Sequence, residues 1–285
     1  MQAEERRYSL DEIAPYINWV YFDHAWQMGG VANHADTLQG TQRWTAYEAL
    51  HRDAQNMLSE LAGHYSTHAR FMLVAANSDG DDIVLHLDDR TERLPMLRQQ
   101  HVTAGQPCLC MADFLRPLSS GEADRIGIFA VTADEGIELF HHEDPYQALL
   151  AQTLADRLAE ATAERLHEQV RQHDWGYAPN EALTMEQLHH EEFQGIRPAV
   201  GYPSLPDLSL NFLLDDLLDM GQIGIRLTEN AMMRPHASVS GLMMAHPEAR
   251  YFSIGKVGED QIQDYSRRRG LPMETVRRFL SIYRT

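Results

Sequence analysis

Residues 71–89 read FMLVAANSDGDDIVLHLDD. Two apolar runs flank the turn-forming cluster at residues 77–81, a pattern that predicts a β-hairpin. Further strands are expected at 126–132, 237–244 and 251–257, the last two close together late in the chain. The pattern therefore predicts an α+β fold with a central antiparallel sheet flanked by helices, and not a doubly wound parallel sheet.

Three segments show the apolar spacing of amphipathic helices: residues 45–62, 145–173 and 274–283. The longest begins at Pro145, a residue suited to a first helical turn. Its buried face is expected to carry Leu150, Leu154, Leu158 and Ala161. Its other side carries acids spaced four apart, Asp156, Glu160, Glu164 and Glu168. Such a stripe is usually a solvated face.

The start of the chain contains a helix signal but no domain boundary. Ser9 followed by Glu12 is a capping box and predicts a short first helix. Residues 1–8 are polar, and we expect them to form a flexible lead-in. No repeat, low-complexity tract or Gly/Ser linker divides the remainder. We therefore expect one domain over residues 9–285.

The composition argues against several functions. Lys and Arg number 24 and Asp and Glu 42, so the formal net charge of -18 disfavours nucleic acid and anionic membranes as partners. No apolar run reaches about 18 residues, and charges replace the apolar stretch of a secretory signal. We therefore expect a cytoplasmic protein. Cys108 and Cys110 are too close together in the sequence for a disulfide to link distant parts of the fold, and we expect both to be reduced.

The segment Arg197-Pro198-Ala199-Val200-Gly201-Tyr202-Pro203 carries the functional signal. Each proline pushes the preceding residue out of the helical region, and Gly201 supplies conformational freedom between them. The result is an extended loop whose backbone groups we expect to lack a sheet partner and to be free for the edge of a ring such as adenine. Arg197 offers a planar fork that suits a carboxylate.

Here the sequence resembles the activation domain of cobalamin-dependent methionine synthase, whose signature is Arg-Pro-Ala-Pro-Gly-Tyr-Pro after Gln-Gly-Ile. The resemblance covers about residues 9–283. Further matching blocks follow in order: LADRLAEATAERLHEQVR at 154–171, WGYAPNE at 175–181, LTENAMMRPHASVSG at 227–241 and HPEARYFSIGKV at 246–257.

The resemblance implies a single C-shaped domain that binds S-adenosylmethionine in a shallow groove. Arg197 would bind the methionine carboxylate, while Ala199 and Tyr202 would contact the adenosine and the corrin side. Tyr202 is accordingly the corrin-facing candidate for a catalytic role. The implied cofactor-binding set is Asn18, Glu160, Glu191, Arg197, Pro198, Ala199, Gly201, Tyr202 and Tyr251, with no metal ligand.

Three positions depart from the family pattern. Asn18 stands in Tyr-Ile-Asn-Trp where the family has Tyr-Ile-Asp-Trp, so a carboxylate thought to contact the ligand is replaced by an amide. If that part of the groove is desolvated, the loss is worth about 1.5–3 kcal/mol of binding energy. Val200 replaces the middle proline of the signature, and Leu205 replaces a cysteine.

The implied reaction is the reductive methylation of oxidised cobalamin, with S-adenosylmethionine as methyl donor. The usual cobalamin-binding mark, Asp-x-His-x-x-Gly, is absent from the sequence, so the cobalamin would be carried by a partner domain or chain, and this chain would be part of a methyltransferase. The implied electron donor is of the acidic flavodoxin type. The arginines at 267–269, 277, 278 and 284 are either a solvated helix face or a docking surface for it.

Three other interpretations compete with this one. The chain could be a non-catalytic module that senses S-adenosylmethionine or cobalamin. An ordinary methyltransferase would need a Gly-x-Gly-x-Gly loop or a radical Cys-x-x-x-Cys-x-x-Cys motif, and neither is present. A metal site would start from the runs at 141–144 (HHED) or 189–192 (HHEE), but neighbouring side chains point apart and rarely bind one ion.

Overall fold

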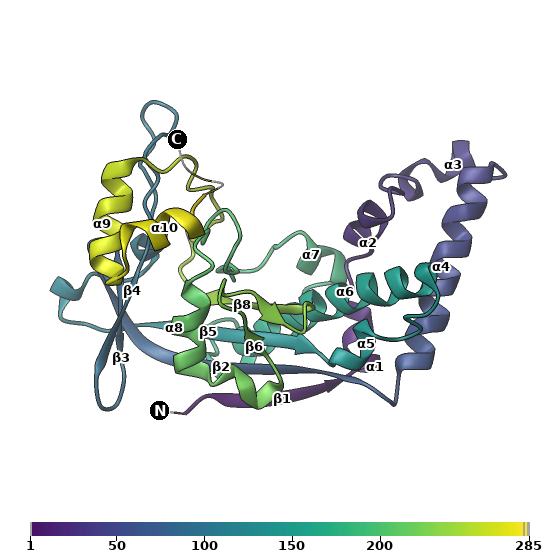
Figure 1. Cartoon of the computed structure of the whole chain (residues 1–285), viewed down its shortest axis with the longest axis horizontal. Coiled ribbons are helices and arrows are strands. Elements are labelled where there is room, and N and C mark those ends of the chain that lie inside the picture. Colours follow the sequence, from purple (N-terminus) through teal and green to yellow (C-terminus); the bar gives the residue numbers. More distant parts are fainter. Residues whose placement is uncertain (1, 282, 284–285) are drawn as a thin grey trace.

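A computed structural model describes residues 2–281 and residue 283 (Figure 1). Six strands form one antiparallel sheet in the order β4-β3-β2-β5-β8, with β1 beside β2. The strands are β1 (Glu4–Ser9), β2 (Ser66–Asp79), β3 (Asp82–His86), β4 (Thr91–Pro95), β5 (Asp124–Ala133) and β8 (Ser238–Met243), with a separate ribbon of β6 (Arg226–Leu227) and β7 (Met233–Arg234). The predicted α+β class is confirmed.

The quoted hairpin is formed by β2 and β3, which meet at the pair Asp79 and Asp82. Gly80 takes a φ of 61° in the turn, a conformation that glycine adopts without steric cost. At 14 residues β2 is long enough to pair with β1 through its first half and with β3 through its second. Its other edge pairs with β5 along most of its length.

The predicted flexible lead-in is wrong for residues 4–8, which belong to β1; residue 1 lies outside the described part. The run Glu-Glu-Arg-Arg lacks the apolar alternation of a strand, so its order comes from tertiary contacts. Arg6 donates to Asp174 at 2.6 Å and lies 4.8 Å from the ring of Phe71. Tyr8 is buried and donates to Gln169 at 2.6 Å.

The helices agree with the predicted ones over most of their length. Asp144 caps the first turn of α6, and a π turn over Val170–Asp174 completes the predicted span of 145–173. The predicted capping residue Ser9 accepts from the backbone of Glu12. The helices are α1 (Leu10–Ile13), α2 (Trp19–Ala25), α3 (Ala35–Leu38), α4 (Gln42–Leu61), α5 (Glu135–Glu138), α6 (Pro145–Gln169), α7 (Met185–His189), α8 (Leu210–Leu218), α9 (Glu259–Arg269) and α10 (Met273–Phe279).

Two predicted elements differ from the observed ones. Residues 251–256 are irregular rather than a strand, and only Val257 makes an isolated bridge. The segment instead follows the 197–203 loop, where Ile254 donates to the Pro203 carbonyl at 3.0 Å. The last helix, α10, ends at Phe279 instead of 283, and residue 282 of the predicted span lies outside the described residues.

The sheet is buried on both faces, and alternate residues of its central strands face two separate clusters. Phe71 and Phe129 point into the first cluster, with α1, α4 and α6. Val74 and Ile128 point into the second, with α8 and the β3–β4 hairpin. In Figure 1 the helices α2 to α4 rise at one end and α9 and α10 at the other, which gives the expected C-shaped outline.

The structure also places the two cysteines, as well as most of the arginines that lie near the end of the chain. Both cysteines are free, and Cys110 is buried with its thiol pKa raised to about 12 by burial. Arg268 pairs with Asp82 at 2.6 Å and Arg277 with Glu259 at 2.8 Å, so much of the basic end is balanced within the fold; Arg284 lies outside the described residues. None of the helices in the described ranges is both long and apolar enough to cross a bilayer.

Candidate functional site

Residues 196–200 run along the outer edge of β8. Val200 donates to Ser240 at 2.9 Å, and Leu242 donates to the Pro198 carbonyl at 3.0 Å. The approach is close, because a Cβ added at Gly241 would lie 2.2 Å from the Pro198 carbonyl oxygen. The expectation that this loop has no sheet partner is therefore wrong for the side that faces β8.

The opposite side of the loop faces away from β8. The amide of Arg197 donates to the Tyr251 hydroxyl at 3.1 Å, and the Ala199 carbonyl accepts from Tyr202 at 3.3 Å. Within the described ranges the Arg197 carbonyl and the Ala199 amide form no hydrogen bond, which leaves one acceptor and one donor. Gly201, at a φ of 90°, turns the chain and donates to Leu205 at 2.8 Å.

Eight of the nine predicted binding residues line one groove of about 590 Å³. Gly201 is the exception, because it shapes the loop without lining the groove. Residues that the sequence reasoning did not assign come from η1 (Ala14–Tyr16), α2, α6, α7 and the loops. The full lining is Tyr16, Asn18, Tyr21, Arg157, Glu160, Ala161, Glu164, His189, Glu191, Arg197, Pro198, Ala199, Tyr202, Pro203, Ser204, Tyr251 and Phe252.

Arg197 is held by Glu164 of α6. Its Nη2 and Nη1 donate to the two carboxylate oxygens at 2.6 and 3.3 Å, and the two side chains are only 14% and 6% exposed. Burial lowers the pKa of Arg197, but Glu164 and the further charges of Glu160 and Glu191 outweigh it and raise that pKa overall. The guanidinium is therefore a permanent charge.

The acidic stripe on α6 is not the solvated face that its spacing indicates. Glu164 and Glu168 are buried, and Glu168 accepts from Tyr16 at 2.6 Å and from Arg165 at 3.0 Å. Glu160 accepts from the Tyr202 hydroxyl at 2.9 Å. Burial, followed by the Glu160 charge, raises the pKa of Tyr202, so the phenol is protonated and donates this bond.

Glu191 has an unusual backbone conformation for a glutamate. It follows the C-cap of α7 with a φ of 56°, its amide donates to Leu188, and the next amide donates to Gln187, both at 3.0 Å. This is a Schellman motif, in which the left-handed position is normally glycine. The side chain lines the groove, where burial raises the carboxyl pKa more than Arg197 lowers it.

Asn18 has a structural role as well as a place in the groove. Its side-chain oxygen caps α2 by accepting from Val20 at 3.1 Å. Aspartate caps helices about equally well, so the capping role does not by itself require the amide.

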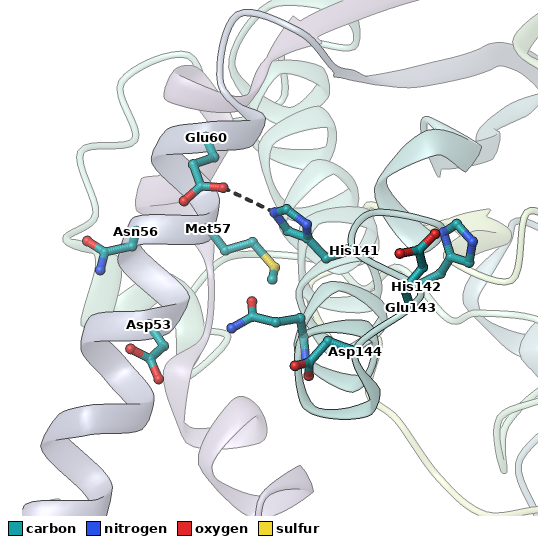
Figure 2. Close-up of a pocket in the computed structure, with 9 residues that line it drawn as sticks. Asp53, Asn56, Met57, Glu60, His141, His142, Glu143 and Asp144 are labelled. Atoms are coloured by element: carbon teal, nitrogen blue, oxygen red, sulfur yellow. Dashed lines mark hydrogen bonds and ion pairs between the residues drawn. The ribbon is translucent and has the colours of Figure 1, made fainter.

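A second hollow, of about 710 Å³, lies between α4 and the loop before α6 (Figure 2). It contains the run HHED at 141–144 that raised the metal alternative. Figure 2 shows His141 directed at Glu60, 3.4 Å away, while His142 and Glu143 lie on the other side of the loop. Across the described ranges no three His, Cys, Asp or Glu side chains converge as metal ligands would.

The groove of about 590 Å³ combines two arginines, of which Arg197 is held in place by Glu164, with three glutamates, aromatic rings and two free backbone groups. These features define a binding domain for a small ligand that combines a carboxylate, positive charge and a planar ring.

Comparison with known proteins gives the family. The model of the vitamin B12 dependent methionine synthase activation domain matches residues 9–270, and this chain belongs to that family. A solved structure of the MetH reactivation domain bound to AdoHcy (S-adenosylhomocysteine) is 38% identical, with a TM-score of 0.92. The match covers 100% of this chain and 90% of that one. The family is vitamin B12 dependent, which implies a cobalamin-binding partner domain.

Proposed function

We propose that this chain binds S-adenosylmethionine in the groove and supports the reductive methylation of oxidised cobalamin in methionine synthase. The observation that carries the proposal is Arg197. A guanidinium has five N–H donors, and Glu164 takes two, so three remain for a ligand carboxylate. The match to a reactivation domain solved with AdoHcy supports the same class of ligand.

The other groups of the groove complement the rest of this ligand. Glu160 and Glu191 oppose its ammonium and sulfonium charges. The free carbonyl of Arg197 and the free amide of Ala199 match the amino group and a ring nitrogen of adenine. Tyr202 is 54% exposed, so its ring faces outward, where a corrin would be presented.

The contribution of this chain is to position S-adenosylmethionine relative to the cobalamin. Transfer of a methyl group from a sulfonium needs an in-line approach and exclusion of water, and it needs no general base. Cobalamin, which a partner domain or a separate chain would hold, would supply the metal centre for the electron and methyl transfer. We further propose a flavodoxin-type electron donor and a cytoplasmic location, which agree with this chemistry.

Titration calorimetry with S-adenosylmethionine and S-adenosylhomocysteine tests the ligand. Arg197→Met should weaken both at least about tenfold. Failure of the wild-type chain to bind either ligand would refute the proposal. A second assay adds a cobalamin-binding module and a reductant and follows the cobalamin spectrum. Binding without methylation would favour the alternative of a non-catalytic sensing module.

A further inference from the structure

Glu164 makes the closest polar contact of the Arg197 side chain. Two parallel hydrogen bonds, at 2.6 and 3.3 Å, join the guanidinium to one carboxylate. Such a two-point contact sets the plane of the guanidinium as well as its position. Because Glu164 is buried in α6, a helix of 25 residues, the carboxylate itself has little freedom to move.

The ring of Phe193 gives the guanidinium a second contact. Arg197 Cζ lies 5.8 Å from the ring centroid, and Arg171 Cζ lies 4.0 Å from the same centroid. Arg171 is fully buried and donates three hydrogen bonds of 2.6–3.0 Å to Glu181. The Phe193 ring is therefore packed against an anchored group and provides a fixed wall beside Arg197.

We propose that Glu164 is a positioning residue, which orients Arg197 so that its remaining donors meet the carboxylate of the ligand. This inference rests on the proposed function. Without the Glu164 carboxylate, the nearby charges of Glu160 and Glu191 would attract the guanidinium instead. Arg197 would then turn away from the ligand, and two acids needed for the ligand's positive charges would be occupied.

Because Glu164 also lines the groove, the test must separate an effect through Arg197 from a direct contact with the ligand. Glu164→Gln, Arg197→Met and the double variant form a mutant cycle. Binding is measured by calorimetry with S-adenosylhomocysteine and with 5′-methylthioadenosine, which keeps the adenosine but lacks the amino acid. Asp82→Asn is the matched control, because Asp82 is an equally buried carboxylate paired with Arg268 outside the groove.

Positioning predicts three results together. Glu164→Gln weakens S-adenosylhomocysteine about tenfold to a hundredfold, 5′-methylthioadenosine changes less than about twofold, and adding Glu164→Gln to Arg197→Met causes no further loss. Asp82→Asn leaves both ligands unchanged. If Glu164→Gln does not fold, Glu164→Asp replaces it, since it keeps the charge but withdraws the carboxylate by one methylene.

Several results would overturn the inference while leaving the proposed function intact. Unchanged affinity of Glu164→Gln for S-adenosylhomocysteine would show that the ion pair of Glu164 and Arg197 is not needed. Tighter binding by this variant would show that Glu164 competes with the ligand for Arg197. Additive losses in the cycle would indicate direct contact. Equal weakening of both ligands would indicate a merely structural role. Failure of the wild-type chain to bind S-adenosylhomocysteine would instead count against the proposed function.

Discussion

Replacing Glu191 by alanine and by glycine separates the backbone cost of this residue from the function of its carboxylate. Both changes remove the carboxylate from the groove, but only glycine relieves the left-handed backbone, which has a φ of 56°. A residue with a Cβ is less stable in this conformation than glycine by about 1 kcal/mol. Glu191→Gly should therefore be about 1 kcal/mol more stable to unfolding than Glu191→Ala, or about 2 °C in Tm for a chain of this size.

Binding should respond differently from stability. Both variants lose the same negative charge, so both should weaken S-adenosylmethionine by about tenfold, or about 1.4 kcal/mol. Urea unfolding measures the first quantity and titration calorimetry the second. Equal stabilities of the two variants would refute the assignment of backbone strain to Glu191. Wild-type affinity in Glu191→Gly would refute a role for its carboxylate in the groove.

Three further predictions concern charge. Asn18→Asp should keep the α2 cap and stability within about 0.5 kcal/mol. It should tighten S-adenosylmethionine about twofold to fivefold and S-adenosylhomocysteine, which lacks the sulfonium charge, less; calorimetry that finds equal changes would contradict this. Glu181→Ala leaves the fully buried Arg171 unpaired and should cost about 3–5 kcal/mol in urea unfolding. Replacing both residues by methionine should cost less. Burial, with Arg171 and Arg197 nearby, holds the pKa of His167 well below its usual range, so only the unfolded chain gains a proton as pH falls below about 6.5. Stability should then fall by up to about 1.4 kcal/mol per pH unit. The free energy of unfolding, measured in urea at several pH values, should depend less steeply on pH in His167→Gln.

The elements that could be predicted are those specified by local pattern. The β2–β3 hairpin has its apolar runs and turn residues within 19 positions, and α6 has its apolar spacing and proline start in one continuous segment. β1 could not be predicted in this way, because Arg6 and Tyr8 find their partners far along the chain, on β2, at the end of α6 and in the π turn that follows it. Residues 251–257 have the composition of a strand, but they pack along a loop.

The groove was predictable where the signature motif covers it. Glu164 was missed because an acidic stripe usually faces solvent, whereas here the stripe is covered by η1 and the 197–203 loop. A signal was available, since Ala155, Ala159 and Ala163 also recur four apart and all are buried. Small residues at that spacing indicate a second face of close packing beside the leucine face.

The groove lies along the junction of the two hydrophobic clusters. Ala161 belongs to the first cluster, against which Tyr16 also packs. Phe252 packs against the second cluster, which contains Val200 of the 197–203 loop. A bound ligand would contact α6 and the 197–203 loop at the same time, so a local opening that separates these two elements would first have to release it. Ligand dissociation and amide hydrogen exchange along α6 and residues 196–200 should therefore become slower together.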